Sequence, residues 1–382
     1  MKVCQLCFYF SRAMINKITF FFFLFVAFGT QGQYARKYSN EFLNIGVGAR
    51  SFGMGNAVIA SISDVNAGYW NPAGMASIQD AAQLSFMHSN YYEKIGSYDF
   101  IAGAAPISKN NVLGVSFNRF GVDDIVNTLG LVQNGQVDYS RIKTFSAVDY
   151  AFYVSYAQRI ELKEKSYAQT LSWGVSPKII FRKVGSFAKA WGFGADVGGQ
   201  YQRKNWMFGV MLKDITTTYN TWNITLTNEE KDIFFQTGNE IPLHSTELTL
   251  PKVIPGVAYK FTVGKKNTVL AETNLDITFD GRRNVVISSK RFNVDPHFGV
   301  EYSYNEKIFI RGGLTNIQNI LDVTDSAAAV KIWVIQPNFG VGIHLKNLTL
   351  DYAITALGSS SVALNSNVFS IKIALNKKAK VQ

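Results

Sequence analysis

One stretch decides the fold class: Val368-Phe369-Ser370-Ile371-Lys372-Ile373-Ala374-Leu375. Its large apolar side chains recur at every second residue, with small or charged side chains between them. Successive side chains of a β-strand point to opposite faces, so this period indicates a strand with one apolar and one polar face. The same alternation appears at 150–156 and 348–354 and recurs from Ala81 onward. The sequence therefore predicts an all-β protein.

Composition narrows the class further. Charged residues make up 17% of the 382 residues, below the roughly 25% of soluble globular chains, and aromatic residues reach 14%. The mean hydropathy is only +0.03, so the apolar residues are dispersed and a helical membrane protein is excluded. The one solid apolar run, 18–28, is shorter than the roughly 20 residues that a spanning helix needs.

That run has the setting of a secretory signal peptide, because a basic residue precedes it and small residues follow it. We predict a signal peptide at 1–32, with Met14 as an alternative start of translation. Its removal takes away both cysteines, Cys4 and Cys7, so the mature chain has none. The basic residues form no cluster outside the tail 376–382, and a nucleic-acid partner is therefore not expected.

The connections between the alternating segments differ at their two ends. We count 14 segments between residues 81 and 375, joined at one end mostly by tight charged turns such as Lys265-Lys266-Asn267 and Asn305-Glu306-Lys307. Long connections join them at the other end, at 121–148, 215–251, 280–295 and 316–331. Within 215–251, Thr227-Asn228-Glu229-Glu230 is a capping box that predicts a short helix.

An even strand number with short turns at one rim and long loops at the other is typical of outer-membrane barrels, whose short turns are periplasmic. We predict a 14-stranded antiparallel transmembrane β-barrel at 81–375, in contact with outer-membrane lipids. Both termini are then periplasmic, and 376–382 forms a basic periplasmic tail. A soluble β-sandwich is the alternative, because alternation alone is common to both.

Residues 33–80 are rich in Gly, Ala, Asn and Ser and lack a long alternating run. They hold too little apolar area for a core of their own. We therefore expect them inside the barrel as an N-terminal hatch, or capping its periplasmic mouth.

With the apolar face toward lipid, the inner face of the barrel receives charges of both signs. They are Asp196, Lys260, Glu272, Asp276, Glu301, Arg311, Asp351 and Lys372. Mixed signs fit a lumen filled by the hatch and locked by ion pairs. A wet, open pore is the alternative.

Two hatch motifs carry a family resemblance: Gly48-Ala49-Arg50-Ser51-Phe52-Gly53-Met54-Gly55-Asn56-Ala57 and Trp70-Asn71-Pro72-Ala73-Gly74-Met75. They resemble the PorV/PorQ family of Bacteroidota outer-membrane proteins, which belongs to the wider class of FadL-like 14-stranded barrels. Gly74 stands where we expect Lys in PorV itself, which indicates a paralogue. The residues that we assign to a structural or gating motif are Arg50, Gly53, Met54, Gly55, Trp70, Asn71, Pro72, Ala73 and Gly74.

The resemblance implies an outer-membrane location and no enzymatic activity. It further implies a role as accessory subunit of a protein-export or assembly machine of the type IX secretion kind. The partner is then a secretion translocon, a barrel-assembly machine or exported cargo. The alternative function is that of a FadL-like transporter of hydrophobic small molecules.

Sites for metals or catalysis are not expected. The four histidines, His88, His244, His297 and His344, have no second ligand at metal-binding spacing. No Ser/His/Asp set can be singled out among the many serines. We predict neither a metal nor another cofactor.

Overall fold

The computed structural model describes residues 39–91, 95–133, 136–162, 169–238, 244–321, 331–355 and 366–376. The predicted signal peptide, residues 33–38 of the predicted hatch and residues 377–382 of the predicted tail lie outside this part of the chain. None of the helices within it combines the length and apolar character that a membrane crossing requires.

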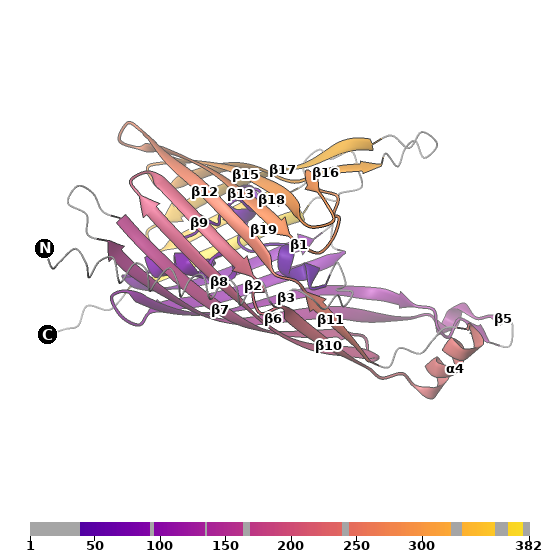
Figure 1. The fold of residues 1–382 in the computed structure, drawn as a ribbon. Coiled ribbons are helices and arrows are strands. Elements are labelled where there is room, and N and C mark those ends of the chain that lie inside the picture. Colours follow the sequence, from indigo (N-terminus) through magenta and orange to yellow (C-terminus); the bar gives the residue numbers. More distant parts are fainter. Residues whose placement is uncertain are drawn as a thin grey trace, which may run out of the picture. The chain divides into compact units, whose positions relative to one another are not determined.

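The strands form one antiparallel sheet that closes on itself, because β1 (Ala81–Tyr91) pairs with both β2 (Gly96–Pro106) and β19 (Ser366–Asn376) (Figure 1). The other wall strands are β3 (Asn111–Asn127), β6 (Lys143–Leu162), β7 (Gln169–Val184), β8 (Ala188–Arg203), β9 (Trp206–Lys213), β10 (Thr218–Ile224), β11 (His244–Thr249), β12 (Lys252–Val263), β13 (Asn267–Thr278), β15 (Asn293–Tyr304), β16 (Ile308–Leu321), β17 (Lys331–Leu345) and β18 (Leu348–Thr355).

The wall has 14 strand positions. β9 and β10 together fill the position next to β8, and β11 and β12 together fill the next position, of which β12 pairs with β13. The short strand β14 (Ile287–Ser288) only adds to the end of β15. The predicted 14-stranded barrel is therefore confirmed.

The two faces of the wall explain the alternation. On β19, Phe369, Ile371 and Ile373 are 55%, 44% and 40% exposed on the outer face, whereas Ser370 is 7% exposed on the inner face. An apolar outer surface suits lipid, and closure leaves no unpaired sheet edge inside the bilayer.

All four predicted loops are wrong in extent, since β14 and the start of β15 lie within 280–295 and the end of β16 lies within 316–331. The segment 215–251 contains β10, the helix α4 (Asn228–Gln236) and β11. The end of β3 and the start of β6 occupy much of 121–148. Between them lie the hairpin of β4 (Val132–Gln133) and β5 (Gln136–Val137) and the turn η3 (Tyr139–Arg141). These strands continue past the rest of the wall toward α4 (Figure 1). Their two faces both mix polar residues with apolar or aromatic ones, such as Phe145, Tyr219 and Trp222, which hides the alternation. The predicted capping box at Thr227 and Glu230 is confirmed.

The short turns lie at one end of the barrel, called here the short-turn end, and the longer connections at the loop end. Two loop-end connections, 92–95 and 185–187, are only four and three residues long. Inside the wall lies the hatch, residues 39–80, with η1 (Glu41–Asn44), α2 (Ala49–Gly53), α3 (Ala67–Trp70) and η2 (Pro72–Ser77).

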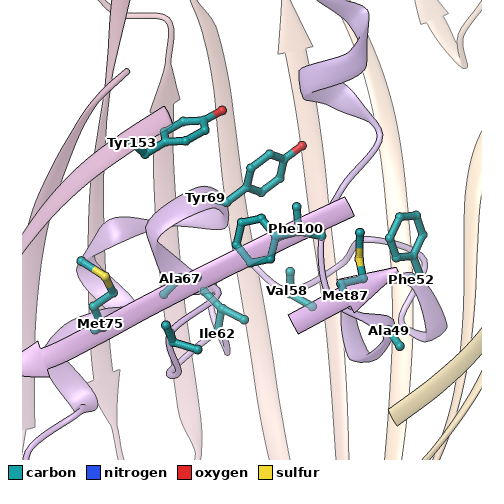
Figure 2. Packing of buried hydrophobic residues seen from close by; sticks show 14 of the residues in the cluster. Ala49, Phe52, Val58, Ile62, Ala67, Tyr69, Met75, Met87, Phe100 and Tyr153 are labelled. Atoms are coloured by element: carbon teal, nitrogen blue, oxygen red, sulfur yellow. The ribbon is translucent and has the colours of Figure 1, made fainter. Parts of the chain in front are cut away.

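The hatch supplies half of the buried apolar residues in the described part of the chain. Figure 2 shows Tyr69, Met75 and Ile62 of the hatch beside Phe100 and Tyr153 of the wall. The Tyr69 ring meets those of Tyr153 and Phe100 edge-on, with centroids 6.2 and 6.5 Å apart. The wall therefore completes a core that the hatch cannot close alone.

Candidate functional site

Glycines on the inner wall give the hatch backbone its seats. A Cβ placed on Gly313 would lie 2.1 Å from the Gly55 nitrogen, and one on Gly299 would lie 2.4 Å from the Met54 oxygen. These distances are far below van der Waals contact, so any side chain there would displace the hatch. The glycine seats are Gly174, Gly198, Gly209, Gly299, Gly313 and Gly340.

Asn71 anchors the second motif. Its side chain is fully buried and donates to the carbonyls of Ile59 (2.9 Å) and Gly199 of the wall (3.2 Å). Its Oδ1 accepts from the Ala73 amide at 3.2 Å and caps η2, where Pro72 occupies the first turn. The Asn-Pro-Ala element thus ties two hatch segments to β8.

Around that element the packing leaves no room for larger side chains. A Cβ on Gly74 would lie 2.2 Å from the Ile62 oxygen. Ala73 is fully buried. Trp70 donates from Nε1 to the Val47 carbonyl at 2.8 Å. These contacts give the motif a structural role.

Arg50 links α2 of the hatch to the wall. Its Nε lies 2.9 Å from Glu301, which also accepts from Arg311 at 2.6 Å, and Arg311 contacts Asp351 at 2.7 Å. Burial opposes the charge of Arg50, but Glu301 outweighs that effect and holds the pKa of Arg50 above its usual value. Removing one partner of such a buried pair typically costs about 3–5 kcal/mol.

A second set of contacts holds the middle of the hatch. Asp64 pairs with Lys372 of β19 at 2.6 Å, and Glu272 of β13 accepts from the Ala60 amide at 2.7 Å. Burial disfavours the Asp64 carboxylate, yet Lys372 outweighs burial and lowers the pKa of Asp64 below its usual value. Together with Arg50, these contacts brace the hatch against several strands.

The remaining predicted charged residues line the lumen outside the Arg50 and Asp64 ion pairs. Asp276 pairs with Lys252 at 2.7 Å, and Lys260 lines a cavity at the short-turn end with Arg50 and Glu301. Asp196 pairs with Lys178 at 2.7 Å. Sequence reasoning missed Lys178 and Lys252, although both continue the inward-facing period of their strands.

The hatch lies between two cavities of the lumen. The cavity at the loop end, called here the vestibule, has a volume of about 410 Å³ and is lined by Asn44 and Phe52 of the hatch. The cavity at the short-turn end measures about 320 Å³. A smaller inner pocket of about 30 Å³ adjoins the vestibule through shared lining at Asn44, Lys252 and Asp276.

The inner pocket is more apolar than the vestibule. Ile59 and Trp70 of the hatch and Met211 and Ile254 of the wall line it and pack as one cluster. Lys213 also lines it, and its buried ammonium donates to the Leu43 carbonyl.

Beside this pocket the ladder of the wall is interrupted. β9 pairs with β12 up to Lys213 and Lys252, and β10 resumes with β11 at Thr218 and Thr249. The intervening residues, 214–217 on one side and 250–251 on the other, form no ladder pair between them. Pro251 has no N–H to contribute. We call this interruption the wall gap.

A buried ion-pair cluster braces the wall gap. Lys178 contacts Asp196 at 2.7 Å and Asp214 at 2.6 Å, and its side chain is fully buried. Asp214 and Thr217 have positive φ angles of 55° and 58°, so the strand turns sharply there. No alternation pattern could have predicted Asp214 as an inward residue, because the turn breaks the period.

Within the described residues, no group of three His, Cys, Asp or Glu side chains could hold a metal ion. His297 instead lies 3.0 Å from the Gly55 oxygen and 2.7 Å from Thr315, against the hatch. His88 contacts Asp99 on the outer face, and His344 contacts the Lys346 carbonyl. The side chain of His244 is outside the described part.

No protein-family model and no curated protein matches this sequence. Solved structures do match. The toluene transporter TbuX of Ralstonia pickettii is 14% identical, with a TM-score of 0.53 over 87% of this chain and 99% of that one. The CymD monoaromatic hydrocarbon channel is 14% identical, with a TM-score of 0.54 over 88% and 98%. A FadL homologue of Pseudomonas aeruginosa is 10% identical, with a TM-score of 0.48 over 86% and 98%.

This chain has the fold of FadL-like outer-membrane barrels. The named neighbours are transporters and channels, not enzymes. None of the comparisons bears on the PorV/PorQ resemblance or on a Bacteroidota source, which stay predictions.

Proposed function

We propose that this FadL-like barrel admits small hydrophobic compounds at its loop end and releases them sideways through the wall gap. The observation that carries the proposal is the position of the wall gap beside the inner pocket. Lys213 and Lys252 line that pocket and also mark the last ladder pair before the gap. An apolar compound that widens this pocket of about 30 Å³ would therefore lie next to the wall gap.

The fixed hatch supports a sideways route over an axial one. The glycine seats and the Arg50 and Asp64 ion pairs hold the hatch against the wall on several sides. A sideways exit leads an apolar molecule directly into the bilayer and avoids the charged short-turn cavity. Transport of toluene and monoaromatic hydrocarbons by the neighbours TbuX and CymD agrees in chemistry with this role.

Uptake of 1-N-phenylnaphthylamine, an apolar dye that fluoresces in membranes, tests the proposal in porin-deficient cells. The wild-type barrel should raise uptake above the vector level. Met211→Trp fills the inner pocket and should return uptake to that level. Met207→Trp, on the same strand but lining the short-turn cavity, is the matched control and should retain uptake. Equal uptake with wild type and empty vector would refute the proposal.

The second candidate is an accessory subunit of an outer-membrane export or assembly machine, with a translocon or exported cargo as partner. The braced hatch favours it, because a permanently closed lumen suits a scaffold. The helix α4 adds a surface on which Phe235 is 75% exposed. Stoichiometric co-purification of another envelope protein in mild detergent, without dye uptake, would support this candidate over transport.

A further inference from the structure

The vestibule has a different chemistry from the inner pocket, and its lining is mostly uncharged and polar. Eight of its 22 lining residues are Asn or Gln, and four more are Ser or Thr, whereas only Ile45 and Val285 are aliphatic. An apolar ligand would leave these amides without partners, at a cost for each buried polar group. The lining therefore favours a ligand with many hydrogen-bonding groups.

Most charges of the vestibule are already partnered within the protein; the exception is Asp295, which lies 4.0 Å from His297 and whose buried Oδ1 has no donor among the described residues. Lys252 contacts Asp276 at 2.7 Å, and Arg283 contacts Asp280 at 2.5 Å and Glu41 at 3.4 Å. An ionic ligand would have to compete with these pairs. A neutral ligand leaves them intact.

The amide side chains of the vestibule lining offer donors and acceptors together. Hydroxyl groups also donate and accept, so a ligand rich in hydroxyl groups can pair with both kinds of atom.

Size and aromatic content complete the description. The volume of about 410 Å³ lies near the lower end of the roughly 300–1,000 Å³ range of ligand pockets, which suits one or two sugar rings. Phe52 and Tyr91 supply aromatic lining.

We propose that the vestibule is a binding site for a neutral saccharide of one or two rings. The saccharide contacts the amides on β16 and β17, where Gln318, Asn316 and Gln336 form a hydrogen-bonded chain. The site adjoins the inner pocket, but Gln318, Asn316 and Gln336 do not line that pocket, so saccharide binding does not depend on the proposed passage of hydrophobic compounds. A bound saccharide covers the entrance to the inner pocket.

Calorimetric titration of the full chain in detergent micelles tests the site with glucose, maltose and gluconate. Glucose or maltose should bind at millimolar concentration or below, and gluconate, the anionic relative of glucose, should bind about tenfold more weakly. Gln318→Met with Gln336→Met removes two amides at similar side-chain size and should weaken saccharide binding at least about tenfold, or about 1.4 kcal/mol. Thr268→Val with Ser303→Ala makes a matched change in the short-turn cavity and should leave binding unchanged.

Three outcomes would overturn the proposal: no binding of either saccharide, gluconate binding as well as glucose, or equal binding by the Gln318/Gln336 variant and wild type. Heat-modifiable migration in cold SDS verifies that each variant is folded. Dye uptake is measured separately on the same variants. Loss of saccharide binding with uptake retained would leave the transport proposal standing, and the reverse result would leave this one standing.

Discussion

Gly312 and Gly313 are neighbours on β16 that face opposite sides of the wall. A Cβ on Gly313 would lie 2.1 Å from the Gly55 nitrogen and 2.3 Å from the Met54 carbonyl carbon, whereas a Cβ on Gly312 would meet nothing within 4 Å. Gly313→Ala therefore adds a methyl group against the hatch, and Gly312→Ala adds the same group on the outer, lipid-facing side. The difference between the two variants isolates the contact with the hatch.

The expected magnitude follows from the displacement. Reaching ordinary contact at 3.4 Å from 2.1 Å requires a shift of 1.3 Å in the hatch backbone. The hatch cannot move freely, because the Gly299 seat and the His297 contact hold the same turn. Overpacking typically costs about 1–3 kcal/mol, and each broken hydrogen bond adds about 1 kcal/mol. Gly313→Ala should thus lose about 2–4 kcal/mol, and Gly312→Ala should gain roughly 0.5–1 kcal/mol.

Unfolding in urea, followed by tryptophan fluorescence of the barrel in lipid vesicles, measures this difference. Planar-bilayer conductance on the same preparations reports whether the displaced hatch leaks. We expect a lower midpoint or a new steady conductance for Gly313→Ala and neither change for Gly312→Ala. Equal midpoints and equally silent bilayers would show that the hatch does not sit on the wall at this glycine.

Three other predictions concern single substitutions. Asn71→Ala removes three hydrogen bonds but no wall strand, so the barrel should still fold, with unfolding free energy lowered by about 2–4 kcal/mol in urea titration. On intact cells, cysteine at Asn223 at the loop end should react with an impermeant thiol reagent and cysteine at Lys266 should not; the reverse labelling would overturn the orientation. The Asp64–Lys372 pair should contribute fully to stability at pH values above 3.8, the usual pKa of the carboxyl group. This contribution should disappear as the pH falls through the lower pKa that Asp64 has in the folded protein. Unfolding measured by acid titration should therefore depend less on pH in the Asp64→Asn variant.

The barrel could be predicted from sequence because a lipid-facing wall imposes a strict period. Along 366–376 every outward-facing residue is large and apolar, except at the end of the strand. The pattern can therefore be recognised without knowing the partner strands. The period fails where both faces meet water or polar neighbours. Asn220 and Trp222 of β10 are buried inward while Tyr219 and Thr221 face outward, and this mixture reads as a loop.

The candidate site was predictable only in part. Arg311, Glu301 and Asp351 follow from the inward period and the register between their strands. The wall gap does not, because it depends on two positive φ angles in 214–217 that shift the following residues out of phase. The vestibule was missed for another reason: it gathers residues from the hatch and from strands far apart in sequence, and no local pattern marks them.

The bracing of the hatch has a consequence for how the molecule assembles. η2 contacts β6, β7 and β8, while α2 contacts β16, β17, β18 and β19 across the lumen. One bond, from the Ala49 amide to Ser370 Oγ, joins residues 321 positions apart, and such distant contacts form late in folding. The hatch therefore reaches its final packing only when the wall closes around it. We infer that pairing of β19 with β1 and burial of the hatch complete folding in one concerted step.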